Sequence, residues 1–580
     1  MGAEERRRAA LAAAGKAAFD LVIRNVRLVN VFTSEIYPAH IGVAAGLVAA
    51  VFPGEAPVPV AKEVVDGAGR YAVPGLIDSH LHVESSMVLP PAFAAALVPR
   101  GVLTIIADPH EIANVMGLAG IRMFVDAGRG LPLDCFWQVP SCVPASPLET
   151  AGAAIGPDEV QELLSWPEMI ALGEVMDFPG VIAQTGRTAD ILARAVALGA
   201  VIEGHAPNLT GRDLAAYVTA GVNSDHTLVT PELALERLRA GVTLQLQYKS
   251  LTPETLKTAE AAAKSLNLCL VTDDVLPDDL VSTGHLDHIL RTAIQRGLSP
   301  VEAIRAATLA PARRMRLYDR GAIAPGLLAH IVLTPSLEEF RAELVFHRGR
   351  LVAQDGRLVV ELPAYTVPEE ALQTVRIAPP GPEDFVVPVR SSAATARVRV
   401  MALSRKTTYT AAEVHEVPVA DGQLQWEAAG LCLAAVFERH GRTGTRGYGL
   451  LHQALERGAV ASTWAHDSHN LLVVGRAASD MAAAARWVVE RGGGMAAALD
   501  GQILAAVHLP VGGIVSPLPV EQVAEQVRAF RAALGQLGFT HPSPFMALGA
   551  LTLAVSPELK VTDKGLVDVQ EGRIVDLFVA

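Results

Sequence analysis

Eight short apolar runs recur along the first half of the chain, and segments with apolar residues at helical spacing separate them. Runs such as 102–106 (VLTII) and 268–271 (LCLV) are almost wholly apolar, which is typical of strands buried on both faces of a parallel sheet. Segments such as 231–239 and 253–266 begin with Pro, as helices often do. Eight successive strand and helix units predict a closed (β/α)8 barrel of the TIM type, and therefore an α/β fold.

The length of 580 residues exceeds what one hydrophobic core usually supports, so further domains are expected around the barrel. Residues 21–30 and 41–51 have the pattern of β-strands, and the run 321–335 returns to β structure after the barrel. We predict that these segments form one small β-sandwich-like domain. The predicted order is an N-terminal helix and β subdomain (1–74), the barrel (75–320), a return to the β subdomain (321–362), a Pro-rich linker (363–388) and a C-terminal α+β domain (389–580).

The charge balance argues against nucleic-acid binding. The chain has 48 Lys and Arg against 61 Asp and Glu and a net charge of −13, whereas phosphate neutralisation needs a clustered excess of basic residues. The four cysteines are widely spaced, unlike those of a disulfide-stapled secreted domain, so we expect them to be reduced. The sequence shows neither a signal-peptide pattern nor an apolar run long enough for a membrane span. We therefore expect a cytoplasmic protein with no nucleic-acid or membrane partner.

Polar residues end each of the eight apolar runs. The proposed strand ends are 78–80 (DSH), 107–109 (ADP), 138–140 (QVP), 173–174 (GE), 204–205 (GH), 225–226 (DH), 246–247 (LQ) and 272–273 (TD). Functional sites in such barrels form at the C-terminal mouth, from the strand ends and the loops after them. These polar residues are therefore expected to share one site.

His80 and His82 are two residues apart on an extended segment, so their side chains leave on the same face and can converge on one ion. Alone, this pair is weak evidence for a metal, since two polar residues can simply end a strand. The same mouth is expected to receive Glu174, His205, His226 and Asp273. Six such groups suit a pair of divalent cations with one bridging carboxylate, whereas burying them without metal would be costly.

Several longer stretches carry a resemblance to a known family. In the predicted barrel they are 74–87 (PGLIDSHLHVESSM), 107–114 (ADPHEIAN), 173–181 (GEVMDFPGV), 204–207 (GHAP), 224–226 (SDH) and 272–274 (TDD). In the predicted C-terminal domain they are 465–470 (AHDSHN), 512–516 (GGIVS) and 557–569 (PELKVTDKGLVDV). Over nearly its full length the chain resembles the adenine deaminase family, a branch of the amidohydrolase superfamily.

The resemblance implies a role for each strand-end residue. It assigns the first metal to His80, His82 and Asp273, the second to His205 and His226, and the bridge between them to Glu174. It implies hydrolytic deamination of adenine to hypoxanthine and ammonia, with attack on C6 of the purine by a hydroxide between the two ions. Asp273 would pass the proton to the leaving ammonia, so Asp273 and Glu174 are expected to be catalytic as well as ligating. The resemblance favours Mn2+, and the ligand types also suit Fe2+ or Zn2+.

Residues near these strand ends are further candidates. The candidate catalytic residues are His110 and Glu111, which follow the second strand. The candidate substrate-binding residues are Glu84, Ser85, Ser86 and Thr227. Hydroxyls and carboxylates at these positions can bond the ring nitrogens of a heterocycle. For all of them except Thr227, the alternative is that they only cap loops and turns.

A compact polar group precedes a predicted strand of the C-terminal domain. Its members are His466, Asp467, His469 and Asn470. A separate metal site or a cap over the substrate is conceivable. We favour a hydrogen-bond network at the domain interface, because neighbouring side chains on extended backbone point in opposite directions and cannot all face one ion.

Two departures from the family pattern border the site. The family usually has Glu directly after the strand-six His, where this chain has Thr227, and an Arg-Glu-Gly-Ser segment where 247–250 (QYKS) stands. The proposed metal ligands are untouched, so the alternative to adenine is another aminated heterocycle or a cyclic amide. A non-catalytic binding protein is more remote, because such a protein is expected to have lost ligands. We expect a small-molecule substrate and a homo-oligomer, a dimer.

Overall fold

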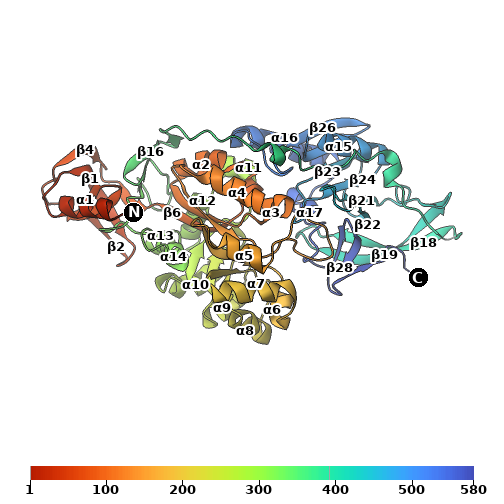
Figure 1. Cartoon of the computed structure of the whole chain (residues 1–580), viewed down its shortest axis with the longest axis horizontal. Coiled ribbons are helices and arrows are strands. Elements are labelled where there is room, and N and C mark those ends of the chain that lie inside the picture. The colour runs from red at the N-terminus through yellow and green to blue at the C-terminus, as the bar shows by residue number, and fades with distance from the viewer. Residues whose placement is uncertain (1, 391, 580) are drawn as a thin grey trace.

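The structure is a computed structural model that describes residues 2–390 and 392–579; residues 1, 391 and 580 of the predicted terminal domains lie outside the described residues. Figure 1 shows three parts in a row. A β-sheet with the N-terminal helix α1 (Ala3–Ala13) lies at one end, the barrel lies in the middle, and residues 395–579, named the C-terminal region, lie at the other end.

Parallel strands around a common centre form the barrel. They are β6 (Leu76–Leu81), β7 (Val102–Ala107), β8 (Asp134–Val139), β9 (Met169–Val175), β10 (Val201–Gly204), β11 (Ser224–Asp225), β12 (Thr243–Leu246) and β13 (Leu268–Leu270). Strands β6 to β10 form one hydrogen-bonded sheet and β11 to β13 form another. The sheets meet where the Gly204 N–H donates to Ser224 Oγ at 3.0 Å and where the Asp273 N–H donates to His80 O at 3.1 Å. The predicted α/β barrel is therefore confirmed.

Helices follow the barrel strands and cover their outer face. They are α2 (Pro90–Leu97), α3 (His110–Met116), α4 (Leu118–Gly128), α5 (Pro157–Leu163), α6 (Phe178–Ala183), α7 (Gly186–Ala197), α8 (Gly211–Thr219), α9 (Pro231–Arg239), α10 (Pro253–Lys264), α11 (Pro277–Ser282), α12 (Leu286–Gln295), α13 (Pro300–Ala306) and α14 (Leu309–Arg314), with 3-10 turns η1 (Glu84–Ser86), η2 (Val98–Arg100) and η3 (Tyr248–Ser250). Helices α9 and α10 begin at Pro, where a missing N–H costs nothing. The preceding Thr230 and Thr252 accept first-turn N–H groups through their side chains.

One nine-stranded sheet combines the segments before and after the barrel. Its strands are β1 (Phe19–Asn30), β2 (Glu35–Ala44), β3 (Leu47–Pro53), β4 (Ala61–Asp66), β5 (Tyr71–Pro74), β14 (Ile331–Thr334), β15 (Leu344–His347), β16 (Arg350–Gln354) and β17 (Arg357–Leu358). Strand β14 pairs antiparallel with β5 and so joins the two segments. The prediction of a single strand over 41–51 is wrong. Ala45 and Gly46 have φ angles of 52° and 77°, and this left-handed turn separates β2 from β3.

The C-terminal region contains a mixed nine-stranded sheet in the order β20-β19-β18-β22-β21-β24-β23-β25-β26 and a three-stranded sheet of β27 to β29. The strands are β18 (Thr395–Leu403), β19 (Thr410–Ala420), β20 (Gln423–Leu424), β21 (Cys432–Phe437), β22 (Arg446–His452), β23 (Ala459–Ser462), β24 (Leu471–Gly475), β25 (Gly494–Leu499), β26 (Gln502–His508), β27 (Leu559–Thr562), β28 (Gly565–Asp568) and β29 (Arg573–Val575). The helices are α15 (Ala478–Glu490), α16 (Val520–Gln536) and α17 (Pro544–Gly549).

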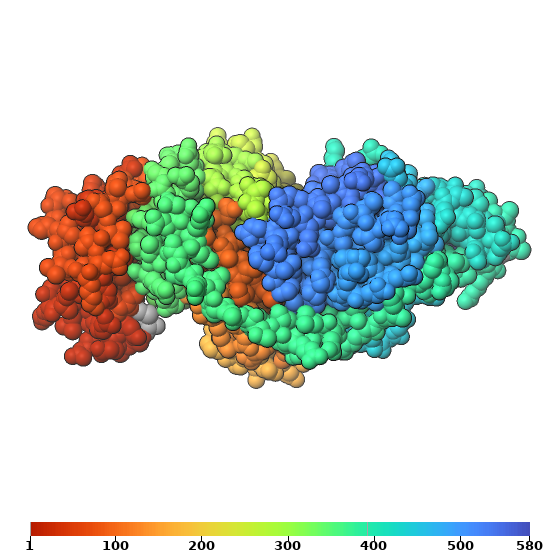
Figure 2. All heavy atoms as spheres, turned by 90° about the horizontal axis from the view of Figure 1, so that it is seen from above, coloured from red at the N-terminus to blue at the C-terminus, as the bar shows by residue number. Residues whose placement is uncertain are grey.

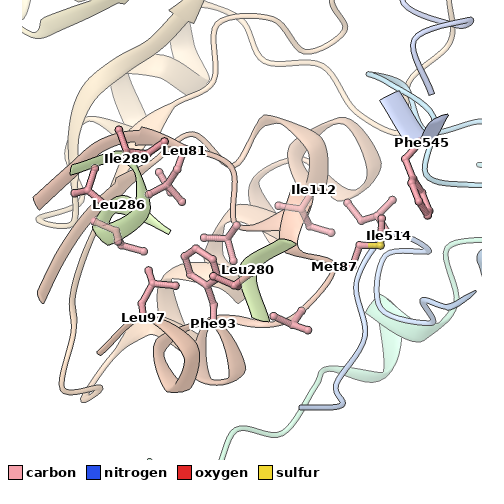
Figure 3. Close-up of a cluster of buried hydrophobic side chains, with 14 of the residues drawn as sticks. Leu81, Met87, Phe93, Leu97, Ile112, Leu280, Leu286, Ile289, Ile514 and Phe545 are labelled. Atoms are coloured by element: carbon pink, nitrogen blue, oxygen red, sulfur yellow. The ribbon is translucent and has the colours of Figure 1, made fainter. Parts of the chain in front are cut away.

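The C-terminal region packs against the mouth of the barrel. Figure 3 shows its Ile514 and Phe545 beside Met87 and Ile112, which follow barrel strands β6 and β7, and a single hydrophobic core includes all four. The connecting segment, with 3-10 turns η4 (Glu369–Leu372) and η5 (Pro382–Phe385), runs along the surface in Figure 2. Across the described residues 2–390 and 392–579, no helix combines the length and the apolarity that crossing a bilayer requires.

Candidate metal and substrate site

The predicted metal ligands lie together at the C-terminal mouth of the barrel, and they come from different strands. His80 is in β6, His82 follows β6, Glu174 is in β9, His205 follows β10, His226 follows β11 and Asp273 follows β13. Most of their side chains are buried, and those of His205 and Asp273 are 29% and 14% exposed. The closed barrel therefore brings together side chains that are far apart along the chain, because the C-terminal ends of its strands meet at one face.

Glu174 lies at the centre of the cluster. Its Oε2 is 2.7 Å from His205 Nδ1 and 3.2 Å from His226 Nε2. Its Oε1 is 3.4 Å from His82 Nε2 and 3.8 Å from His110 Nδ1. Each carboxylate oxygen thus faces a different pair of imidazoles, so one oxygen is available to an ion on either side of Glu174.

Asp273 lies next to His80 and His82. Its Oδ1 is 3.7 Å from His80 Nε2 and 3.6 Å from His82 Nε2. Its Oδ2 accepts a hydrogen bond from Gln247 Nε2 at 2.8 Å. The backbone of Asp273 has a φ of +62°, a left-handed conformation that is uncommon for a residue with a side chain and is concentrated at functional sites.

His110, which the sequence predicts to be catalytic, lies directly beside the predicted metal ligands. It is the first residue of α3, and its Nδ1 has no hydrogen-bond partner among the described residues although the side chain is buried. One ligand atom each from His82, His110 and Glu174 lies within 4.8 Å of the others. The sequence pattern placed His110 at the mouth but gave no sign that its ring would face Glu174.

The donor set fits divalent cations. Both ring nitrogens of buried His80 lack a hydrogen-bond partner within the described part of the chain. His82 Nδ1 lies 3.0 Å from Asp108 O, so in the neutral ring Nδ1–H donates to this carbonyl and Nε2 is left free to ligate. Ligand atoms of His80, His82 and Asp273 lie within 4.8 Å of one another, as do those of His80, Glu174 and His226.

Without a cation, the carboxylates and imidazoles of the cluster set one another's protonation states. Burial alone would raise the pKa of Glu174, but the charge of His226 and hydrogen bonds from His205 and His226 hold that pKa well below its usual value. Burial likewise opposes ionisation of Asp273, and the nearby imidazoles of His80 and His82 keep its pKa well below the usual range. Burial lowers the pKa of His80 and so favours the neutral ring. Burial opposes protonation of His82 and His226, but the nearby carboxylates raise the pKa of His226 to about 9 and that of His82 well above its usual value. Because metal ligation needs neutral imidazoles, a cation would displace protons from these two rings.

Side chains of Asp78, Asp108 and Gln247 hydrogen-bond to the backbone of the proposed ligands. The sequence did not predict this supporting role. Asp108 Oδ2 accepts the Glu174 N–H at 3.1 Å, and Asp78 Oδ1 accepts the His80 N–H at 3.3 Å. Gln247 donates to His226 O at 3.0 Å as well as to Asp273. Their position at predicted strand ends was the available signal, but the pattern did not separate ligands from the residues that hold them.

The candidate substrate-binding residues fall into two groups. Ser86 Oγ donates to Val83 O at 2.6 Å, and Thr227 Oγ1 donates to Asp225 Oδ1 at 2.8 Å, so both hydroxyls are engaged within their own turns. Glu84 is different. Its Oε1 accepts the Ile112 N–H at 3.2 Å, whereas its buried Oε2 has no partner among the described residues.

Ser85 and Glu111 lie beside each other at the edge of the cluster. Ser85 Oγ donates to Asp274 Oδ1 at 2.5 Å and lies 3.2 Å from Glu111 Oε1. Burial and the neighbouring charge of Glu84 raise the pKa of Glu111 well above its usual value. Glu111 is therefore a buried carboxyl next to the ligands and not a loop cap at the surface.

Residues 465–470 of the C-terminal region, named the closing loop, lie next to Glu111. His469 Nε2 is 3.6 Å from Glu111 Oε2, and His466 Nδ1 is 3.9 Å from Glu111 Oε1. Asn470 Nδ2 donates to Thr150 O, in the loop after β8, at 2.8 Å. The group thus lies between the barrel and the C-terminal region.

Two family models match the chain. The amidohydrolase family matches residues 71–352, and the adenine deaminase C-terminal domain matches residues 407–573. Among solved structures, a dihydropyrimidinase from Brevibacillus agri is similar at 17% identity with a TM-score of 0.44, and the match covers 58% of this chain and 96% of that one.

Curated proteins match over nearly the whole chain. "Adenine deaminase 2" of Shouchella clausii is 40% identical over 566 residues, which are 97% of this chain and 99% of the relative. The adenine deaminase of Moorella thermoacetica is 42% identical over 586 residues, which cover 99% of this chain and 98% of the relative. The chain belongs to the adenine deaminase family of the amidohydrolases.

Proposed function

We propose that the protein hydrolyses adenine to hypoxanthine and ammonia, with a bond from C6 to oxygen formed and the bond from C6 to the amino nitrogen broken. The observation that carries the proposal is the position of Glu174 between two sets of histidines. The full-length relatives named adenine deaminase support the choice of substrate.

Two divalent ions, Mn2+ by preference, are the proposed cofactor. The first would be held by His80, His82 and Asp273, the second by His205 and His226, with Glu174 between them. Ions at these positions would supply a lowered pKa for water and polarisation of the purine. His110 is close enough to Glu174 to be a further ligand or to hold the substrate.

Asp273 is the proposed proton carrier. Gln247 donates to one of its oxygens and so fixes the orientation of the carboxylate, while the other oxygen faces the histidines. A carboxylate held beside the reacting atoms can accept a proton from water and return it to the leaving amino group. Glu84, Ser85 and Glu111 are proposed to line the substrate position, since they are buried beside Asp274, the neighbour of Asp273.

An ammonia-release assay tests the proposal. The protein is loaded with Mn2+ and offered adenine, other aminopurines and aminopyrimidines, with a chelator-treated sample as the control. We expect strong ammonia release from adenine that the chelator abolishes. Ammonia release from another heterocycle and none from adenine would favour the second candidate, a hydrolase of a different aminated ring or cyclic amide. The observation behind this candidate is that Gln247 and Thr227, which depart from the family pattern, lie beside the proposed ligands.

Two further expectations concern the molecule in the cell. We propose a homodimer and a cytoplasmic location. Light scattering coupled to size-exclusion chromatography tests the first, and fractionation of the source cells tests the second.

A further inference from the structure

Buried polar atoms without a hydrogen-bond partner among the described residues lie on both sides of the join between the barrel and the closing loop. They include Oε2 of Glu84 and Oε2 of Glu111 on the barrel side, and Nε2 of His466, Oδ2 of Asp467 and Nε2 of His469 in the closing loop. All five residues are at most 5% exposed. Since burying a polar atom without a partner is unfavourable, such a set indicates a place where a polar ligand binds.

A chain of contacts connects the closing loop to the reaction centre. Asp274 follows the proposed proton carrier Asp273 and accepts the hydrogen bond of Ser85 at 2.5 Å. Ser85 lies 3.2 Å from Glu111, and Glu111 lies 3.9 Å from His466. The closing loop is therefore connected to the residue after Asp273 through a series of buried side-chain contacts.

A third metal ion is the first explanation that this cluster suggests, because ligand atoms of Glu111, His466 and His469 lie within 4.8 Å of one another. The hydrogen bonding of His469 argues against it. Its Nδ1 accepts the Ala465 N–H at 3.2 Å, so in the neutral ring the proton must be on Nε2. A protonated Nε2 cannot ligate a cation, but it can donate to Glu111 Oε2, which lies 3.6 Å away.

We infer that the closing loop forms one wall of the purine pocket, in which His466 and Asp467 contact the ring edge and His469 is a positioning residue that orients the Glu111 carboxylate. The inference rests on the proposed function and extends it to a specific role for the C-terminal region. A purine edge offers both a ring N–H, which a carboxylate accepts, and unprotonated ring nitrogens, which an imidazole N–H or a protonated carboxyl can bond.

The closing loop is built to hold these side chains in place. Buried Arg439 donates through Nε to His469 O and through its backbone N–H to Asn470 Oδ1 at 3.1 Å. Thr552 Oγ1 donates to His466 O at 2.6 Å. His469 itself has a φ of +53°, a left-handed conformation that persists in a residue with a side chain only where its surroundings enforce it.

The inference can be tested with Asp467→Asn, His469→Leu and His469→Gln in the full-length, Mn2+-loaded protein. Unsubstituted purine, which carries no amino group to lose, is the binding probe in calorimetric titration, and KM and kcat are measured with adenine. Matched controls in the same region are Asp421→Asn and His508→Gln, which are remote from the closing loop in sequence and lie at β-turn and strand-end positions. Metal content and thermal midpoint are measured for every variant.

We expect Asp467→Asn and His469→Leu to weaken purine binding and raise KM by about 10- to 100-fold, as loss of one hydrogen bond to a charged group does. Metal content and midpoint should stay at the wild-type values. His469→Gln retains a donor near the Nε2 position and should recover most of the binding. The controls should match the wild type.

The outcomes separate the inference from the proposed function. If the wild type releases ammonia from adenine and the closing-loop variants bind purine as it does, the inference is overturned. If the wild type acts on another heterocycle, adenine is the wrong substrate, and the same variants are measured with that compound. A raised KM with unchanged metal content would then uphold the closing loop as the pocket wall, and an unchanged KM would overturn it.

Discussion

At the scale of single residues, Glu174 organises the site. One oxygen faces His205 and His226 and the other faces His82 and His110. The surrounding positive charge and hydrogen bonds hold its pKa well below the usual value in spite of burial. A single carboxylate therefore links the two halves of the cluster, and its loss should affect both.

The first prediction is that Glu174→Gln and Asp273→Asn each reduce kcat for ammonia release by about 10²- to 10⁴-fold, because each amide replaces an anionic ligand or proton carrier. Circular dichroism should show an unchanged fold, since both changes preserve the side-chain volume. Exposed Asp421→Asn is the control. Near-normal turnover in Asp273→Asn would show that another group carries the proton.

The second prediction concerns removal of the metal. His80 has two buried ring nitrogens without a partner in the described chain, so the cluster is costly without a cation. A chelator should lower the thermal midpoint by several degrees, because an ion at about 100 times its Kd adds about 2.7 kcal/mol to stability. Mn2+ should restore the midpoint, and elemental analysis should find about two ions per chain. A thermal midpoint that changes neither with the chelator nor with Mn2+ would contradict metal binding at this cluster.

At the scale of the elements, the ligands depend on close contacts between neighbouring barrel strands. Gly173 in β9 lies against Asp108, which follows β7, and a Cβ on Gly173 would lie 2.1 Å from Asp108 Oδ2. The same oxygen accepts the N–H of Glu174. Glycine is therefore needed at position 173 so that the strand can present the central ligand.

The third prediction follows from this contact. Gly173→Ala should destabilise the protein by about 1–3 kcal/mol and lower activity, because the added methyl group has to displace Asp108. The control is Gly535→Ala in α16, where a Cβ would have no atom within 4 Å. That change should stabilise the protein by about 0.5–1 kcal/mol, since alanine favours the helix. Urea denaturation measures both, and an unaffected Gly173→Ala variant would argue that Asp108 does not hold Glu174.

At the scale of the whole molecule, the barrel and the C-terminal region share one interior. A single hydrophobic core contains Phe93 of α2 and Phe530 of α16, and Arg531 pairs with Asp278 of α11 at 2.9 Å. Figure 3 shows this core continuing from Met87 and Ile112 to Ile514 and Phe545 of the C-terminal region. The C-terminal region is thus packed directly on residues that follow the barrel strands.

The fourth prediction is that the barrel and the C-terminal region unfold together. Differential scanning calorimetry should show one transition for the two, because separating them would expose the common core. Arg531→Ala should lower the midpoint slightly without dividing the transition. Two well-separated transitions, with the metal site lost in only one of them, would show that the regions are energetically independent.

The sequence by itself determined the barrel and the positions of the polar residues at its mouth, because both depend on local patterns. A buried strand is recognised by its own apolar residues, and the residue after it follows at a fixed spacing. The turn at Ala45 and Gly46 was missed, since apolar residues continue through it. The predicted domain boundaries stay predictions.

Only the tertiary structure decided which polar side chains face one another. The ring of His110 faces Glu174, whereas the hydroxyls of Ser86 and Thr227 donate hydrogen bonds within their own loops. His469 of the C-terminal region lies next to Glu111 of the barrel. Such contacts depend on rotamers and on packing between segments far apart in sequence, neither of which leaves a local pattern. The cluster of strand-end residues and the interface position of residues 465–470 were therefore predictable, whereas the contact of His469 with Glu111 was not.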